Sequence, residues 1–404
     1  MLNENNISKG VVVMDIETIK GLFTYIDLDI NTKQLNTFVI SKYQNDLKPF
    51  ISHLNAVKRQ IGYNNLAFDS QVIQFILENY YSWLEFELRG QDICKLIYIY
   101  AQKCIENSNN GGWGDYPEWK LKIPQLDLFK VWHYDNKAKM TSLKWIEYMI
   151  DFPNIEEMSI DHWKEDVTIQ ETNEVLVYNE NDVKATYEFY LITIGETENL
   201  LYKGLNKLQL RKDIKTEFGI NCTNYNDVKI GDELNKQGYI QRSGRDKKTL
   251  KPTIIKKDFT FNDCLPNYIE FKTNKFNNFL NNIKNIKVNL DKKQEFIIEY
   301  NGTFYSIMKG GIHSHDSNRI IIPNNNELLV DADIGSQYPN AIRKRKLFPP
   351  HLGKEWLEQY TDTIKRRLDA KKLHKQTKEG KYQAIQEAFK LALNGGGLKI
   401  NVYI

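Results

Sequence analysis

The chain lacks long hydrophobic runs, paired cysteines and a strong net charge. Its longest apolar runs, such as residues 11–14 and 320–322, are far too short to span a membrane, and residues 1–10 are too polar for a signal peptide. The four cysteines have no close paired spacing, which argues against a zinc knot and against a disulfide framework. We therefore expect reduced thiols, no membrane and a cytoplasmic location.

A net charge of +3 is too small to identify a polyanionic partner, so the distribution of charge matters more than its sum. Residues 343–381 contain thirteen Lys/Arg and five Asp/Glu, and this segment would attract a polyanion. With 404 residues, of which 41% are hydrophobic and 12% aromatic, the chain is long enough for about two to three folded domains.

The first apolar segment, residues 11–18, ends in acidic residues. The period of a strand places Asp15 and Glu17 on one face. Two carboxylates side by side favour a cation between them. Taken alone, an Asp-x-Glu pair more often only marks the end of a strand.

A second polar cluster precedes an apolar pattern that predicts a helix over residues 70–77. Asp69 stands where this helix begins. It is either a cap for free backbone N–H groups or a third carboxylate that faces the first two. In the second case Asn64 or Asn65 would offer an amide to a substrate strand.

A third segment, residues 178–190, has the spacing of a helix with Val183 toward the core. Tyr178 and Asp182 are four residues apart, so their side chains share a helical face. A phenol beside a carboxylate can orient a water molecule. Alone, such a pair is more often ordinary helix surface.

Together and in this order, the three segments resemble the three exonuclease motifs of proofreading DNA polymerases, which are Asp-x-Glu, Asn-x-x-x-Phe-Asp and Tyr-x-x-x-Asp. The resemblance implies a mixed α/β chain that begins with a ribonuclease H-like 3′→5′ exonuclease domain over residues 1–195. It implies two Mg²⁺ or Mn²⁺ ions, which suit carboxylate ligands and in-line hydrolysis of a phosphodiester. The implied metal ligands are Asp15, Glu17, Asp69 and Asp182. The implied water-positioning residue is Tyr178, and the implied DNA contacts are Asn64, Asn65 and Phe68.

Residues 127–144 combine aromatic and basic side chains. The mixture is typical of a groove for single-stranded DNA, and equally of a core strand with a solvated turn. Some relatives place an assisting lysine in this region, and Lys139 and Lys144 are both candidates. His133 has no ligand partners at metal-binding spacing, so we expect it to be structural.

Residues 196–300 carry no recognisable catalytic motif and are expected to form a connecting scaffold. Gly310 and Gly311 follow, and paired glycines let a backbone come close to a nucleic-acid strand. They resemble the Tyr-x-Gly-Gly motif between exonuclease and polymerase modules, with Met308 in place of the tyrosine. A plain hairpin turn explains the two glycines nearly as well.

Residues 328–342 resemble the first carboxylate motif of B-family DNA polymerases, in which Asp, two variable residues, Ser, Leu, Tyr and Pro recur, although Gln337 replaces the leucine. The apolar run that ends in acids predicts a buried strand that delivers Asp333 to an exposed turn. The resemblance implies that Asp333 binds a metal ion and that Tyr338 packs beneath the incoming sugar. Asp331 has the same strand phase and is a candidate to share the ion.

Two helical patterns follow, over residues 352–373 and 382–393. They resemble the fingers of the same polymerases. Arg367 and Lys371 match Arg-x-x-x-Lys, and Lys390 with Asn394 matches the second fingers motif, which implies contacts to the triphosphate of a dNTP. The alternative is a solvated basic helix face.

The resemblance ends after Asn394. The second palm carboxylate motif, usually Asp-Thr-Asp, and the thumb are not found in this sequence. We therefore expect residues 301–404 to be an incomplete palm with helical fingers of the compact bacteriophage type, in the bacterial host cytoplasm. On this interpretation the chain is a truncated product, or its C-terminal polymerase portion is encoded separately.

Three functions fit these observations. The leading one is a DNA-directed DNA polymerase with a proofreading exonuclease, acting on primer–template, single-stranded DNA and dNTPs. In that case the chain alone would hydrolyse DNA without synthesising it. The alternatives are a stand-alone 3′→5′ exonuclease with a vestigial basic tail, and a non-catalytic subunit that binds single-stranded DNA.

Overall fold

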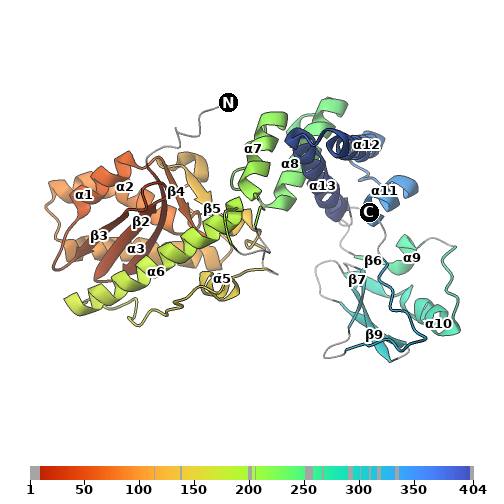
Figure 1. The fold of residues 1–404 in the computed structure, drawn as a ribbon, viewed down its shortest axis with the longest axis horizontal. Coiled ribbons are helices and arrows are strands. Elements are labelled where there is room, and N and C mark those ends of the chain that lie inside the picture. Colours follow the sequence, from red (N-terminus) through yellow and green to blue (C-terminus); the bar gives the residue numbers. More distant parts are fainter. Residues whose placement is uncertain are drawn as a thin grey trace. The chain divides into compact units, whose positions relative to one another are not determined.

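The computed structural model describes residues 10–400 except 113, 137–138, 199–202, 205, 251–257, 266–267, 290–293, 301, 309–310, 316–319 and 333–335. For residues 249, 264, 308, 311 and 395–400 it describes the backbone alone. The chain divides into two compact units, Met1–Ile230 and Gly231–Ile404 (Figure 1). The domain boundaries expected from the sequence lie instead after residues 195 and 300.

The first unit is built on a five-stranded mixed sheet with strand order β3-β2-β1-β4-β5. Its strands are β1 (Val11–Ile19), β2 (Leu22–Asp29), β3 (Leu35–Ser41), β4 (Arg59–Gly62) and β5 (Gln125–Asp127). Strands β1, β2 and β3 form an antiparallel meander, whereas β4 and β5 add in parallel to β1. The expected mixed α/β class is therefore confirmed, with β1 at the centre of the sheet.

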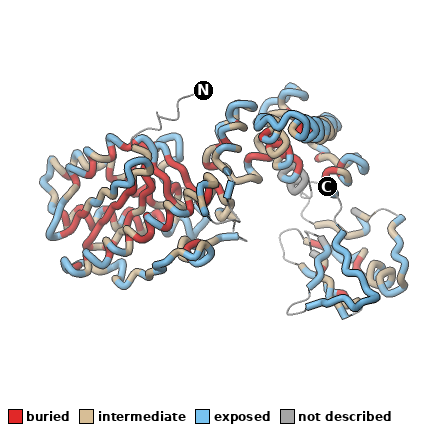
Figure 2. The backbone as a smooth tube through the Cα atoms, viewed as in Figure 1, coloured by how far each residue is buried: buried red, intermediate tan, exposed pale blue. Residues whose placement is uncertain are grey.

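Helices cover both faces of this sheet (Figure 1). The helices of the unit are α1 (Leu47–Ala56), α2 (Asp69–Glu85), α3 (Gly90–Asn109), α4 (Leu128–Val131), α5 (Leu143–Met149), α6 (Ile169–Ile194) and α7 (Lys207–Phe218). Met14 of β1 belongs to the core formed with α1, α2 and α3, whereas Val13 packs with Val183 and Phe189 of α6. Since a strand alternates its side chains, Asp15 and Glu17 lie on the α6 side with Val13. The buried backbone is concentrated in this sheet (Figure 2).

The predicted helices of the first unit are confirmed. The helix expected over residues 70–77 is part of α2, and the one over residues 178–190 is part of α6. Helix α6 begins at a capping box formed by Thr168 and Glu171 and ends at Gly195, whose φ of 77° favours glycine. These signals set the two ends of a 26-residue helix, which packs against Val13 of β1 and contacts Asp15 through Asn179.

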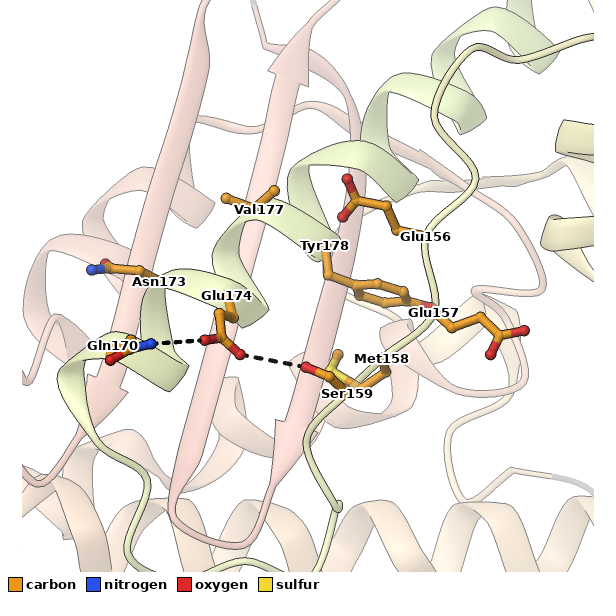
Figure 3. A pocket seen from close by; sticks show the side chains of 9 residues that line it. All are labelled: Glu156, Glu157, Met158, Ser159, Gln170, Asn173, Glu174, Val177 and Tyr178. Atoms are coloured by element: carbon orange, nitrogen blue, oxygen red, sulfur yellow. Dashed lines mark hydrogen bonds between the residues drawn. The ribbon is translucent and has the colours of Figure 1, made fainter.

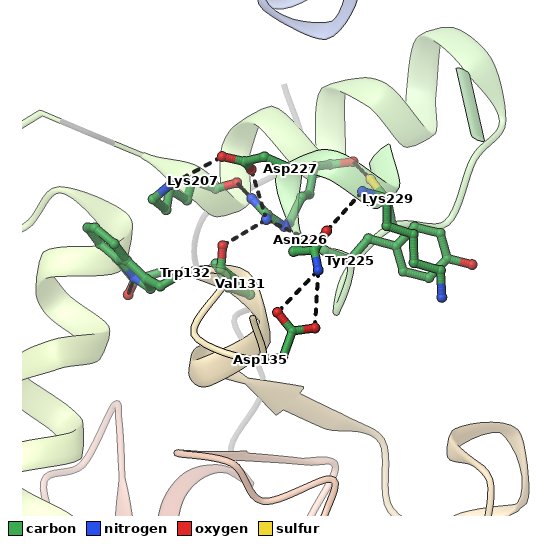
Figure 4. Close-up of polar contacts among 11 residues, drawn as sticks. Val131, Trp132, Asp135, Lys207, Tyr225, Asn226, Asp227 and Lys229 are labelled. Atoms are coloured by element: carbon green, nitrogen blue, oxygen red, sulfur yellow. Dashed lines mark hydrogen bonds and ion pairs between the residues drawn. The ribbon is translucent and has the colours of Figure 1, made fainter. Parts of the chain in front are cut away.

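Helix α7 is fastened to the end of α4 by a buried arginine. The Arg211 guanidinium donates hydrogen bonds to the carbonyl oxygens of Val131, at 3.0 Å, and Tyr225, at 2.7 Å. The ammonium of Lys207 lies 4.6 Å from the Trp132 ring centroid (Figure 4). These contacts hold the C-terminal part of the first unit against its sheet.

The second unit contains small antiparallel sheets and a helical part. Its strands are β6 (Asp258–Thr260), β7 (Lys287–Asn289), β8 (Phe296–Tyr300), β9 (Thr303–Met308) and β10 (Gly311–Ser314), and its helices are α8 (Asp227–Ser243), which begins in the first unit, α9 (Phe261–Cys264), α10 (Asn274–Ile283), α11 (Gln337–Arg345), α12 (Lys354–Thr377) and α13 (Gly380–Ile400). Gly311 pairs with Met308 across β9 and β10, which favours the hairpin interpretation. Gly310 lies outside the described residues.

The predicted helix pair near the C-terminus is confirmed as α12 and α13. The Tyr360 hydroxyl donates to the Leu393 carbonyl at 2.9 Å, and the Arg366 guanidinium lies 4.6 Å from the Phe389 ring centroid. Residue 360 of α12 thus contacts residue 393 of α13, and the later residue 366 contacts the earlier residue 389, so the pair is antiparallel.

The buried strand predicted for the apolar run before Asp333 is not formed by the described residues. Residues 320–332 form no strand, and Leu328, Leu329 and Val330 are 86%, 64% and 67% exposed. A strand needs a neighbour to pair its backbone N–H and C=O groups, and no described strand pairs with this segment. Asp331 is exposed, and Asp333 lies outside the described residues.

Candidate metal and nuclease site

Asp15 and Glu17 lie on the central strand β1, after the part of that strand that pairs with β4. The two strands pair only from Val11 to Val13, whereas on its other side β1 stays paired with β2 through Asp15 and Glu17. On the β4 side, the acidic part of β1 therefore has no partner among the described strands. Both acids are half-buried and lie at the carboxyl end of the parallel strands.

Helix α6 brings a third acid to this point. Carboxylate oxygens of Asp15, Glu17 and Asp182 all lie within 4.8 Å of one another, which is close enough to share a metal ion. Asn179 supports the group from the same helix: its Nδ2 donates to Asp15 Oδ2 at 2.6 Å, while its Oδ1 accepts from Thr24 Oγ1 at 3.3 Å. Sequence reasoning missed Asn179, although its spacing of three from Asp182 places it on the face toward the sheet.

Asp69 lies at the first residue of α2 and is buried. Its negative charge raises the pKa of both Asp15 and Glu17, which places it beside them, although it is not one of the three acids within 4.8 Å. Its own pKa is raised to about 7 by burial, against hydrogen bonds from the backbone of Asp69 and Ile16. Asp69 is the first helical residue of α2, after the N-cap Phe68, and its carboxylate accepts a hydrogen bond from its own backbone N–H. The two roles expected for Asp69 are therefore compatible.

The four carboxylates hold their protons unusually tightly. Burial, followed by the charges of neighbouring acids, raises the pKa of Asp15 well above its usual value and that of Glu17 to about 8. Burial also raises the pKa of Asp182, even though Lys144 opposes the shift. Clustered acids of this kind are stabilised by protons or by a cation.

Of the two candidate lysines, Lys144 is the one at the acids. Its Nζ lies 2.5 Å from Asp182 Oδ1 and 3.2 Å from Glu147 Oε1. Burial opposes the charged form of Lys144, but the hydrogen bonds and charges of these two acids outweigh it and raise its pKa. Lys139 is exposed, and its charge acts instead on Lys207.

Tyr178 is half-buried one helical turn before Asp182. Its ring lies 4.5 Å from the Lys144 ammonium, and its pKa is raised by burial and by the Asp182 charge. Tyr178 also lines a cavity of about 490 Å³ together with Glu156, Glu157 and Glu174 (Figure 3). Three glutamates around this cavity disfavour a phosphate there.

The two candidate asparagines in the loop before α2 have different surroundings. Asn65 is buried, and its Nδ2 donates to Gln125 Oε1 at 2.8 Å, so its amide is used inside the fold. Asn64 is half-buried, with a φ of 60°, and its backbone N–H donates to Asp127 Oδ1 at 3.0 Å. The side chain of Asn64 is thus the more accessible of the two to solvent, while Phe68 packs partly against the core.

Helix α5 carries an aromatic pair that sequence reasoning did not single out. Trp145 and Tyr148 are 56% and 64% exposed, and their rings stack with centroids 5.3 Å apart. They alternate along the helix with Lys144 and Glu147, which contact the acid site. The same short helix therefore provides an exposed aromatic surface and a cation beside the carboxylates.

The residues expected to bind a dNTP lie in the second unit. Tyr338 is exposed on α11, Arg367 is half-buried and Lys371 exposed on α12, and Lys390 is exposed on α13 with Glu387 at 3.4 Å. Asn394 is also exposed on α13. Asp333, the metal ligand expected in this part of the chain, lies outside the described residues.

Comparison with protein-family models found no match, and comparison with curated proteins found no significant relative. In the part of the chain that the structure describes, no helix has the length and apolar character needed to cross a membrane. The function is therefore inferred from the site itself.

Proposed function

We propose that the chain is a metal-dependent 3′→5′ DNA exonuclease with a ribonuclease H-like fold, and that it forms the first part of a B-family DNA polymerase. The observation that carries the proposal is the approach of the Asp15, Glu17 and Asp182 oxygens to within 4.8 Å, with Asp69 beside them. A site made only of carboxylates suits Mg²⁺ or Mn²⁺, because both prefer hard oxygen ligands. The ligand set therefore fits the two ions that the motif resemblance implies.

The acids would hold the ions, and the other side chains have separate tasks. Two bound ions would supply a hydroxide nucleophile and steady the leaving oxygen of the phosphodiester. Lys144 keeps a positive charge next to Asp182, where it neutralises charge on the scissile phosphate. Tyr178 is placed to orient a water molecule near Asp182, and Asn179 fixes the orientation of Asp15.

The substrate of this site is the 3′ end of single-stranded DNA. The exposed stack of Trp145 and Tyr148 lies on the helix that carries Lys144, and aromatic faces stack on bases without sequence preference. Asn64 adds an amide from the loop before α2. Continuous duplex DNA offers no unstacked base to such a pair, so a frayed or single-stranded end is favoured.

The polymerase part of the proposal rests on the second unit. Residues 343–381 are strongly basic, and α12 and α13 form the antiparallel pair that the fingers resemblance implies. Because residues 1–404 carry only one palm carboxylate motif, we propose that they hydrolyse DNA without synthesising it.

The testing experiment uses a 5′-labelled primer annealed to a longer template, with Mg²⁺ and with or without all four dNTPs. We expect the chain to shorten the primer and not to extend it. The Asp15→Ala/Glu17→Ala variant should shorten the primer at least about 10³-fold more slowly, since it loses both acids of β1. Undiminished shortening by this variant contradicts the nuclease proposal, and extension of the primer contradicts the proposal that residues 1–404 do not synthesise DNA.

A stand-alone exonuclease is the second candidate, because the three acids that share the site all belong to the first unit. In that case Lys371→Ala/Lys390→Ala would leave both shortening and DNA binding unchanged. The polymerase proposal instead expects weaker DNA binding by this variant.

A further inference from the structure

Glu147 is a buried acid to which the proposed reaction gives no role. None of its side chain is exposed, and its Oε1 accepts a hydrogen bond from Lys144 Nζ at 3.2 Å. Its Oε2 is buried and has no hydrogen-bond partner among the described residues. A buried carboxylate with an unsatisfied oxygen destabilises a fold, so its place beside the acid site points to a function.

The Lys144 ammonium lies between two different carboxylates. On one side is Asp182, at 2.5 Å, which belongs to the three acids that can share a cation. On the other side is Glu147, which does not belong to that group. One ammonium therefore touches a candidate metal ligand and a carboxylate outside the ligand set.

We propose that Glu147 is a positioning residue that retains the Lys144 ammonium at the site when a divalent cation binds the Asp182 carboxylate. The inference rests on the proposed nuclease function. The cation and the ammonium are both positive and compete for the Asp182 carboxylate. The unpartnered Oε2 of Glu147 has capacity for one more N–H donor, so Lys144 has a second acidic partner within the site.

Loss of Glu147 leaves Asp182 as the only acidic partner of Lys144, which strengthens the competition with the metal ion. Glu147→Gln should therefore weaken Mn²⁺ binding about tenfold, the usual scale for a residue that supports a metal ligand. Lys144→Ala removes the competitor and should not weaken binding. The double variant should then bind Mn²⁺ like Lys144→Ala, because Glu147 acts only through the lysine.

The experiment measures Mn²⁺ affinity of the full chain by titration calorimetry, with melting temperatures for every variant. Glu147→Met keeps the buried volume without the charge and should weaken Mn²⁺ binding as Glu147→Gln does. Glu106→Gln, an exposed acid on α3, is the matched control and should change neither quantity. Equal Mn²⁺ affinity in the wild type and both Glu147 variants overturns the proposal, as does a double variant that binds about tenfold more weakly than Lys144→Ala.

Hydrolysis of a 5′-labelled single strand gives a second readout. Glu147→Gln should lower kcat about tenfold at saturating Mg²⁺ and leave KM for DNA unchanged, since Glu147 does not touch the strand. A rise in KM alone contradicts the positioning role. If Asp15→Ala/Glu17→Ala keeps nuclease activity, the proposed function fails, while the Mn²⁺ comparison still decides the role of Glu147.

Discussion

At the scale of single residues, the acid site determines how the protein responds to pH. Burial and mutual repulsion raise the pKa of Glu17 from 4.5 to about 8, and burial raises that of Asp69 from 3.8 to about 7. The folded state thus binds more protons than the unfolded chain. The protonated acids therefore contribute stability that is complete below their ordinary pKa values and is lost as pH rises through 7 to 8. The metal-free protein should therefore melt at a lower temperature at about pH 8.5 than at about pH 5.5, because these two pH values bracket the raised pKa values of Glu17 and Asp69.

Mg²⁺ should remove this loss of stability, because it binds the deprotonated acids of the folded state alone. Thermal melting with EDTA and with Mg²⁺ at both pH values tests the point. Asp15→Asn/Glu17→Gln is the control, and it should flatten the pH dependence and abolish the effect of Mg²⁺. A melting temperature that rises with pH in EDTA through this window would contradict the predicted role of the shared acids.

A second prediction at the residue scale concerns Asn179. Its Nδ2 donates to Asp15 at 2.6 Å and thereby orients one of the candidate ligands. Asn179→Ala should lower the exonuclease rate and the Mn²⁺ affinity about tenfold. Asn173→Ala, on an exposed position of the same helix, is the matched control for helix propensity. Equal rates for the two variants would show that the hydrogen bond to Asp15 does not matter for the reaction.

At the scale of elements, α5 is expected to guide the DNA strand. Trp145→Ala and Tyr148→Ala should each raise KM for a single-stranded oligonucleotide about tenfold, since stacking on a base contributes about 1–3 kcal/mol. Steady-state kinetics on the oligonucleotide measure the effect, and a dinucleotide substrate should show less of it. Trp163→Ala, also an exposed tryptophan of the first unit, is the control. An unchanged KM in both α5 variants would exclude the stacked pair from the DNA path.

Local patterns predicted the elements that carry the acids, but not the contacts between elements. Strand alternation placed Asp15 and Glu17 together, and a spacing of four placed Asp182 beside Tyr178. The choice between Lys139 and Lys144 depends on how α5 docks near α6, which sequence spacing does not encode.

The strand predicted for the apolar run before Asp333 failed for a related reason. Its hydrophobicity is intrinsic to the sequence, whereas a strand also needs a neighbour with which to pair. The exposed Leu328, Leu329 and Val330 show that an apolar run alone does not determine burial.

At the scale of the whole molecule, the two units are expected to divide hydrolysis and strand retention between them. The acids belong to the first unit, whereas the basic segment 343–381 and the exposed Lys390 of α13 belong to the second. Binding of basic side chains to phosphates releases counterions, so affinity for DNA falls as salt rises. Lys371→Ala/Lys390→Ala should therefore reduce the slope of log affinity against log salt by about 1.4, at roughly 0.7 per phosphate contact.

Fluorescence anisotropy of a labelled single strand in EDTA, over a series of KCl concentrations, measures this slope without hydrolysis. Lys48→Ala/Lys58→Ala removes two exposed lysines from the first unit and is the matched control. Cleavage of a dinucleotide by Lys371→Ala/Lys390→Ala should stay at the wild-type rate, because both lysines lie outside the unit that carries the acids. If the control pair lowers the slope as much as the test pair, net charge alone governs binding, and Lys371 and Lys390 make no specific contribution to it.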